Sequence, residues 1–320
     1  MFCTGFMATF LTTPLFARMS KKLGIAGIDV HKIEKPRVPE MCGLAVTLSV
    51  IFSAVIAAMV FHAEARSVLA LVLCISIAAA IGVADDLGPL SSRLKPVLTT
   101  IAAVPIIMLG AYSPYMAIPF LGTTRLTIVY PVLVVAAIPV LANAINMMNP
   151  FNGAMSGTCS ILSLAMIIYL LLLGRSYEAI LPSALLGSLL AFHRYNKYPA
   201  KVFSGNAGDL SVGAAIGALT IMGRIEVPML VAMIPHIANA FYLLSSVGGL
   251  RERREMLFRP TRLLDDGRLD ATEDSKAPIT LSRLILAEGP LRENEIVYSM
   301  IVMTVVSSLL GLVTLFIMGR

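Results

Sequence analysis

The sequence predicts an all-α, polytopic integral membrane protein with about ten transmembrane helices and an active-site face in the cytoplasm. Its 320 residues are 57% hydrophobic and only 14% charged, and the mean hydropathy is +0.84. Such a composition leaves too few polar side chains to cover a soluble globule. Apolar segments long enough to cross a hydrocarbon core of about 30 Å recur along the whole chain.

Ten of these segments are expected to be helices, because lipid offers no partner to an unpaired backbone group and the alternation typical of barrel strands is missing. The expected spans are residues 1–18, 41–61, 67–84, 96–112, 126–146, 156–173, 179–193, 209–224, 227–247 and 296–318. The chain then divides into nine helices with short loops over 1–248, a polar segment over 249–295 and a tenth helix over 296–320.

The distribution of positive charges indicates which of the two orientations across the membrane these helices adopt. Twenty of the 25 Lys and Arg residues fall in alternate loops, over 18–40, 85–95, 143–157, 194–202 and 249–295. We therefore expect those loops in the cytoplasm and both termini outside, in a multi-pass protein of the cell membrane. The net charge of +6 is first a topology signal, and no nucleic-acid partner is expected.

The segment 249–295 differs in composition from the rest of the chain. It contains the run Arg251-Glu252-Arg253-Arg254, then Arg259-Pro260-Thr261-Arg262, then Asp265-Asp266-Gly267. We expect a small structured cytoplasmic appendage with some strand or short helix. The alternative is a solvated loop that only sets the topology.

Paired carboxylates end the third apolar segment, where Asp85 and Asp86 follow an apolar run. Carboxylates are costly at a membrane boundary, so such pairs usually bind a cation, accept protons or contact bound substrate. Lys95 returns to the same boundary ten residues later, where it can pair with the carboxylates or bind a phosphate. The alternatives are helix-end solvation for the aspartates and a positive-inside charge for the lysine.

Four asparagines lie within ten positions at the end of the fifth apolar segment, namely Asn143, Asn146, Asn149 and Asn152. The first two are three residues apart and share a helical face, whereas Asn149-Pro150 breaks the helix and Asn152-Gly153 forms a turn. Amide oxygens can bind magnesium, and the turn can present amides to a base or a phosphate. Helix capping alone would rarely require four asparagines.

A further polar patch covers residues 196–209, from Asn196 to Asp209, directly before an apolar helix. Gly205 and Gly208 permit close backbone approach, and the amino terminus of the following helix favours an anion. Phe203 beside this turn can stack on a flat ring. Packing at the membrane interface is the alternative for this aromatic side chain.

These patches, in this order, resemble the polyprenyl-phosphate N-acetylhexosamine-1-phosphate transferase superfamily over nearly the whole chain. Within it the chain looks most like the archaeal and eukaryotic UDP-GlcNAc:dolichyl-phosphate GlcNAc-1-phosphate transferases, and the bacterial phospho-MurNAc-pentapeptide translocase is a more distant relative. The first loop is similar to the family patterns G-x-D-x-x-K and P-E-x-x-G. Three later stretches of this chain are similar to further motifs of the family: Asp85-Asp86 with Lys95, N-A-I-N at 143–146 and Y-P-A-K-V-F at 198–203.

The resemblance implies a role for each matching residue. It implies catalytic groups at Asp85, Asp86 and Lys95. It implies a magnesium ligand at Asn146, a ring at Phe203 that stacks on uracil, and a hydrogen bond from Asn152 to the base. Further substrate contacts are implied at Asp29, Lys32, Glu40 and Asn196, and more loosely at Arg259 and Arg262, which resemble the loop that grips the pyrophosphate and sugar.

One departure concerns the metal. Where the family usually has aspartate as a second magnesium ligand, this chain has Asn206 after Gly205. An asparagine binds hard cations more weakly than a carboxylate does, and Asp209, one helical turn further on, can supply the missing charge. We therefore expect Mg²⁺, with Mn²⁺ as the alternative, to be held by Asn146 with Asn206 or Asp209.

The implied reaction moves GlcNAc-1-phosphate from UDP-GlcNAc to a polyprenyl or dolichyl phosphate, as in the first membrane step of N-glycosylation. Bringing two anions together requires cations to offset their repulsion, which the lysine, the arginines and the metal provide. The aspartate pair can orient the lipid phosphate or remove its last proton. A covalent aspartyl intermediate is the rival mechanism.

Several alternatives stay open at this point. Another UDP-N-acetylhexosamine is the alternative substrate, and the oligomeric state, including a homodimer, stays open. An ion-coupled transporter is the leading function of another class. Transporters place charges at mid-membrane, however, whereas the ionisable residues here lie at the ends of the spans.

Overall fold

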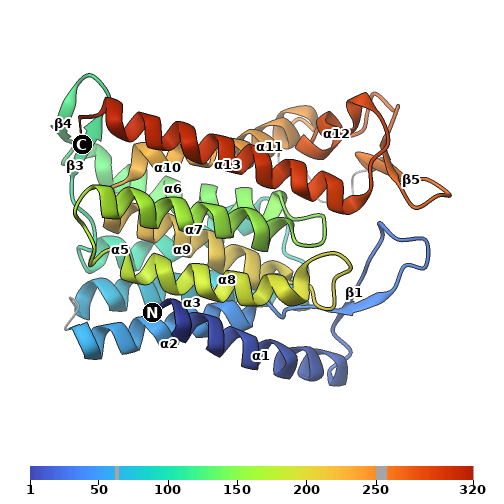
Figure 1. The fold of residues 1–320 in the computed structure, drawn as a ribbon, viewed down its shortest axis with the longest axis horizontal. Helices are drawn as coiled ribbons and strands as arrows, with labels where there is room; N and C mark the ends of the chain where they lie inside the picture. The colour runs from blue at the N-terminus through green and yellow to red at the C-terminus, as the bar shows by residue number, and fades with distance from the viewer. Residues whose placement is uncertain (62–64, 250–257, 320) are drawn as a thin grey trace.

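The computed structural model describes residues 1–61, 65–249 and 258–319, which form a bundle of helices that run side by side (Figure 1). The charged run from Arg251 to Arg254 lies outside the described residues. The longer helices are α1 (Phe2–Lys22), α2 (Leu44–Phe61), α3 (Ala65–Leu87), α6 (Val129–Met147), α7 (Ala154–Leu172), α8 (Ile180–Asn196), α9 (Gly205–Gly223), α11 (Ile234–Ser246) and α13 (Glu293–Ile317). The shorter ones are α4 (Leu94–Thr100), η1 (Ile101–Ala103), α5 (Val104–Met108), α10 (Glu226–Ala232), α12 (Leu281–Ile285) and η2 (Leu286–Glu288).

Each of the ten predicted apolar segments coincides with one of these helices or with a succession of short ones. Among the described residues, α3, α6, α7 and α13 are long and apolar enough to cross a membrane. The pair α10 and α11 makes a fifth candidate span if it is counted as one, and it bends by 63° at its break. The segment predicted over 96–112 is divided into α4, η1 and α5.

Helix α9 is the most deeply buried element, and it packs against both α3 and α6. Small residues make these contacts close. A methyl group added to Gly82 of α3 would overlap the backbone of Ala207, and one added to Gly213 of α9 would overlap the backbone of Ala142 of α6. Small residues at helix interfaces are typical of membrane proteins. This packing places the amino terminus of α9 beside the carboxyl-terminal ends of α3 and α6.

Among the described residues, three antiparallel hairpins lie at the ends of the bundle. Strands β1 (Ala26–Ile28) and β2 (Arg37–Pro39) form the first, and β5 (Thr261–Leu263) and β6 (Leu269–Ala271) form the third. Both lie at the same end, away from the two chain termini (Figure 1). The second hairpin, β3 (Tyr115–Ile118) with β4 (Gly122–Arg125), lies at the opposite end near the carboxyl terminus.

The described part of the segment 249–295 is structured, since it holds β5, β6, α12 and η2. A small apolar core attaches it to the bundle. This core joins Leu269, Leu281 and Leu286 of the segment to residues at the start of α13 and to Phe151 in the turn after α6. The segment therefore packs against the turn that carries Asn149 and Asn152.

Candidate active site

One cavity of about 610 Å³ opens at the end of the bundle that carries β1 and β5. Its volume lies in the range of small-molecule sites. Nine of the residues singled out from the sequence line it: Asp29, Glu40, Asn146, Asn152, Asn196, Phe203, Asn206, Asp209 and Arg259. Five others do not line it: Lys32, Asp85, Asp86, Lys95 and Arg262. These nine residues come from four separate segments of the sequence, 29–40, 146–152, 196–209 and the loop at Arg259, so the fold brings distant motifs into one space.

The ammonium group of Lys95 lies at the centre of a polar cluster behind one wall of this cavity. Its Nζ is 2.7 Å from Oδ2 of Asp85, and it donates to Oδ1 of Asn206 at 2.6 Å and to Oδ1 of Asn146 at 3.2 Å. These partners belong to the ends of α3, α6 and α9. The Lys95 side chain, at 15% exposure, is mostly enclosed by the oxygens that it binds.

Asp86 binds different partners from those of Asp85. Its Oδ1 accepts hydrogen bonds from both the backbone N–H and the side chain of Asn206, each at 2.8 Å, and its Oδ2 accepts from the backbone N–H of Ala207 at 3.0 Å. A carboxylate at this position satisfies N–H groups that the first turn of a helix leaves unpaired. Asp86 therefore fixes the amino terminus of α9 against the end of α3.

Asp209 is buried in the first turns of α9, where Asn149 binds both of its oxygens. The Nδ2 atom of Asn149 lies 3.0 Å from Oδ1 and 2.9 Å from Oδ2 of Asp209, and Nδ2 of Asn146 lies 3.5 Å from Oδ2. Asn149 also accepts from the backbone N–H of Met155 at 3.0 Å. Asn149 belongs to the asparagine run of the sequence, but no separate role was assigned to it there.

The donor set around Lys95 fits a divalent cation of the magnesium type. Oxygens of Asp85, Asn146 and Asn206 already converge on a positive charge, the lysine ammonium. The three predicted metal ligands are neighbours, since Nδ2 of Asn146 donates to Oδ1 of Asn206 at 2.7 Å and reaches Asp209 as well. Carboxylate and amide oxygens are the ligands that Mg²⁺ and Mn²⁺ accept most readily.

Backbone contacts hold Phe203 against the first hairpin. Its N–H donates to the carbonyl of Pro39 at 2.8 Å, and its carbonyl accepts from Cys42 at 3.0 Å. A methyl group added to Gly27 would come within 2.9 Å of the Phe203 ring and 3.1 Å of Oε2 of Glu40. Only a glycine leaves room for both side chains there. The aromatic ring and a carboxylate thus border the same part of the cavity.

Asp29, directly after β1, is buried and ion-paired with Lys32. The Lys32 ammonium also lies 5.0 Å from the centre of the Tyr198 ring, a distance at which a cation is attracted to an aromatic face. These contacts tie the hairpin to the loop before α9. The Lys32 ammonium therefore contacts Asp29 and the Tyr198 ring, and Lys32 does not line the cavity.

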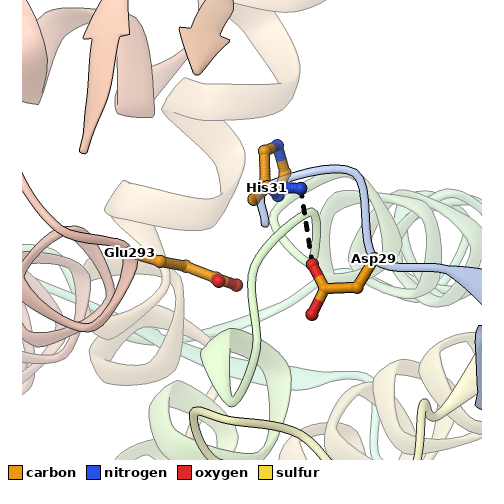
Figure 2. A group of neighbouring side chains, drawn as sticks. All are labelled: Asp29, His31 and Glu293. Carbon is orange, nitrogen blue, oxygen red and sulfur yellow. Dashed lines mark hydrogen bonds between the residues drawn. The ribbon is translucent and has the colours of Figure 1, made fainter. Parts of the chain in front are cut away.

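Asn152 lies between Asp29 and Glu293, the first residue of α13. Its Nδ2 donates to Oδ2 of Asp29 at 2.9 Å and to Oε2 of Glu293 at 3.5 Å, and its backbone N–H donates to Oε1 of Glu293 at 2.7 Å. Figure 2 shows the two carboxylates pointing toward one another, with His31 nearby. Ligand atoms of these three residues lie within 4.8 Å of one another, but the carboxylate oxygens are engaged by Asn152 and Lys32.

Sequence reasoning did not single out Glu293. It is only 3% exposed, although it lies in a segment rich in acidic residues that are mostly at the surface. No local pattern marks it, because its partner Asn152 is 141 positions away.

Asn196, at the end of α8, is bound to the protein on both sides of its amide. Its Nδ2 donates to the carbonyl of Val202 at 3.0 Å, and its Oδ1 accepts from the Ser156 hydroxyl at 2.9 Å. Ser156 in turn lies 2.9 Å from Nδ1 of His193. This network anchors the loop that presents Phe203.

The two arginines of the segment after α11 differ in position. Arg259 lines the cavity, whereas Arg262 lies on β5 with a half-exposed side chain that pairs with Asp270 at 2.8 Å and Glu273 at 3.2 Å. The hydrogen bond and charge of Asp270, supported by Glu273, raise the pKa of the Arg262 guanidinium. The structure brings Arg259 to the other site residues and leaves Arg262 on the hairpin.

Comparison with known proteins identifies glycosyltransferases and sugar-phosphate transferases as relatives of this chain. A family model described as glycosyl transferase family 4 matches residues 68–224. A "putative UDP-N-acetylglucosamine--dolichyl-phosphate N-acetylglucosaminephosphotransferase" of Saccharolobus solfataricus is 30% identical over 73% of this chain and 74% of its own length. A "putative glycosyltransferase" of Methanocaldococcus jannaschii is 32% identical over 85% of this chain and 81% of its own. The UDP-N-acetylglucosamine--dolichyl-phosphate N-acetylglucosaminephosphotransferase of Saccharomyces cerevisiae is 26% identical over 74% and 64%.

Proposed function

Because the chain belongs to glycosyl transferase family 4, we propose that it transfers GlcNAc-1-phosphate from UDP-GlcNAc to a polyprenyl phosphate of the dolichyl type and releases UMP. The relatives named for this reaction support the proposal. The single observation that carries it is the cavity of about 610 Å³, whose lining includes an aromatic ring, Phe203, as well as amide and carboxylate side chains such as Asn152, Asn206 and Asp209. A nucleotide diphosphate also has two parts, a flat base and a charged phosphate chain.

The base would bind at the end bordered by the first hairpin. Phe203 offers a ring for stacking, and Asn152 offers an amide beside it. A base stacked on an aromatic side chain is stabilised by about 1–3 kcal/mol. Asn196 acts indirectly in this proposal, by holding the loop that carries Phe203.

The phosphates would lie toward Lys95, with Arg259 on the other side of the cavity. In the reaction, an oxygen of the lipid phosphate bonds to the β-phosphorus of UDP-GlcNAc, and the bond from that phosphorus to the bridging oxygen breaks. The bridging oxygen leaves with UMP. Fixed positive charges stabilise the charge that shifts to it, because they need no reorganisation during the reaction. Lys95 is such a charge.

Asp85 and Asp86 have different roles in this scheme. Asp85, paired with Lys95, holds the ammonium in place. Asp86 positions Asn206 and the rest of the first turn of α9. When Mg²⁺ is bound, by Asn146, Asn206 and Asp209, it would supply a further positive charge that offsets the repulsion between the two phosphates.

The acceptor lipid would enter between α6 and α11. The same cavity reaches Asn239 and Leu243 on α11 and Met147 at the end of α6. The side chains of Leu243 and Met147 on this path suit a polyprenyl tail, and the helix pair α10 and α11 bends by 63° at its break. A lipid phosphate at this position would face the phosphates of the nucleotide.

The proposed membrane arrangement follows the charges. We assign ten spans to the helical segments that coincide with the ten apolar stretches, and we place the cavity on the cytoplasmic side of a cell membrane, with both termini outside. Twenty of the 25 Lys and Arg residues fall in the alternate loops that include the cavity-lining motifs, and loops rich in positive charge usually stay in the cytoplasm. The described part of 249–295 is then a cytoplasmic appendage that covers the cavity.

The proposal is tested with purified protein, polyprenyl phosphate, Mg²⁺ and a set of radiolabelled UDP-sugars. We expect a labelled lipid from UDP-GlcNAc and a weaker product or none from UDP-GalNAc. Asp85→Asn should abolish the product while the protein remains folded. Glu178→Gln is the matched control, because it neutralises an exposed carboxylate at the opposite end of the bundle. Formation of no labelled lipid from any UDP-sugar by folded protein would refute the assignment.

A further inference from the structure

We propose that Asp29 and Glu293 together orient the Asn152 side chain so that the site selects uracil over cytosine. This inference rests on the proposed function, since it concerns the base of the same nucleotide. It assigns a role to Glu293, which no sequence pattern marks. Glu293 is a positioning residue here, because it acts on the substrate through Asn152.

The geometry allows only one orientation of the Asn152 amide. Its Nδ2 lies 2.9 Å from a carboxylate oxygen of Asp29 and 3.5 Å from one of Glu293. Rotating the amide by a half-turn would place Oδ1 against the Asp29 carboxylate, which is ion-paired with Lys32 and is an acceptor only. All three residues are at most 4% exposed, so water would not replace the lost hydrogen bonds, and the cost of such unpaired groups is high.

Glu293 fixes the backbone at this position as well. Its Oε1 accepts from the N–H of Asn152 at 2.7 Å while its Oε2 faces the side chain of the same residue. One carboxylate thus binds both the backbone N–H and the side-chain amide of Asn152. The next residue, Gly153, lies directly before α7 and has a φ of 90°, a left-handed conformation that favours glycine.

A fixed amide exposes an acceptor to the cavity. Within the described part of the chain, the Asn152 side chain makes its hydrogen bonds only as a donor through Nδ2, and the residue lines the cavity. Oδ1 is therefore the atom left for a ligand. Uracil carries an N–H donor at N3, whereas cytosine carries an acceptor there. An amide that was free to rotate could bind N3 of either base, whereas a fixed acceptor matches N3 of uracil and faces another acceptor at N3 of cytosine.

The carboxylates can play this role because their charge is partly offset. Lys32 pairs with Asp29, and the amide and backbone donors of Asn152 occupy the facing oxygens. His31 packs against Phe151 with ring centres 4.7 Å apart and closes this side of the cavity.

The experiment measures the dissociation constants of UMP and CMP for the purified full-length protein by calorimetry, together with kcat and KM for UDP-GlcNAc transfer. The wild type should prefer UMP by about ten- to hundredfold, the usual effect of one mismatched buried hydrogen bond. In the double variant Asp29→Asn and Glu293→Gln, both carboxylates become amides of the same shape that can accept or donate. The preference should then fall to within about threefold, with KM affected more than kcat.

Several variants keep this test decisive. Asp29→Asn alone should lose more of the preference than Glu293→Gln alone, because its contact with Nδ2 is shorter, and it replaces the double variant if that protein does not fold. Asn152→Ala should abolish the preference, and Glu178→Gln should leave it unchanged. An unchanged UMP preference in folded Asp29→Asn, or equal binding of UMP and CMP by the wild type, would overturn the inference while transfer remains. Absence of both nucleotide binding and labelled lipid in the wild type would instead refute the proposed function.

Discussion

The Nζ atom of Lys95 lies 2.6 Å from Oδ1 of Asn206, the residue that stands where the transferases that this sequence resembles usually carry an aspartate. On its other side, Asn206 donates from Nδ2 to Oδ1 of Asp86 at 2.8 Å. A neutral amide at this position accepts from the lysine and donates to the aspartate at the same time. A carboxylate could do only the first.

Asn206→Asp should therefore make the protein more dependent on divalent cations. Without Mg²⁺, the new carboxylate would face Asp86 at hydrogen-bond distance with no proton between them, which we expect to destabilise the fold by about 1–3 kcal/mol. With Mg²⁺, the added charge should strengthen metal binding. Thermal unfolding with and without Mg²⁺ measures both effects. An equal Mg²⁺-dependent shift in the variant and the wild type would contradict the placement of the metal beside Asn206.

Lys95→Met should reduce the rate of transfer strongly. The substitution keeps the apolar stem and removes the charge that we place beside the departing UMP, and the loss of one such group typically lowers kcat by about 10²–10³-fold. Steady-state kinetics on UDP-GlcNAc measures the change. Lys22→Met is the matched control, because Lys22 is an exposed lysine at the end of α1. A comparable loss of rate in both variants would indicate a general charge effect.

Asp86→Asn should reduce stability as well as activity. An asparagine has a single acceptor oxygen, so one of the N–H groups at the start of α9 that now bind Asp86 would lose its partner. Loss of such a capping interaction costs about 0.5–2 kcal/mol. Asp266→Asn, on the exposed turn of the β5–β6 hairpin, should change the unfolding temperature very little. If Asp86→Asn lost activity at full stability, a direct chemical role for Asp86 would be favoured over the positioning role.

Phe203→Ala should weaken UMP binding by about 1–3 kcal/mol, the usual contribution of one stacked base. Phe203→Tyr keeps the ring and should bind UMP within a few-fold of the wild type. Because the Phe203 backbone also pairs with the first hairpin, thermal unfolding of both variants should be measured alongside binding. Equal UMP affinity of folded Phe203→Ala and wild type would show that the base binds elsewhere.

The helices could be predicted from the sequence because apolar length is a local property. The meeting of Asp85, Lys95, Asn146 and Asn206 was also expected, since loops on one face of a bundle end at the same level. The β3–β4 hairpin over 115–125 was not predicted, because its residues are mostly apolar, lie between two apolar segments and show no alternation of apolar and polar side chains.

The partners of individual side chains could not be predicted in the same way. That Asn149 binds Asp209, that Asp86 holds α9, and that Glu293 holds Asn152 depend on distances between segments far apart in the chain. Arg262 was expected at the pyrophosphate, but Asp270 lies opposite it across the hairpin and pairs with it. Sequence spacing identified the residue types of the site, and packing decided which of them face the cavity.

The most direct test of a phosphosugar transferase uses UDP-GlcNAc labelled with ³²P on its β-phosphate. Purified protein is supplied with this donor, polyprenyl phosphate and Mg²⁺, and the organic and aqueous phases are then counted. We expect the label in the lipid fraction, with one UMP released for each labelled lipid. Label that remains in water as UDP while sugar reaches the lipid would mean transfer of the sugar alone, and would contradict attack at the β-phosphorus.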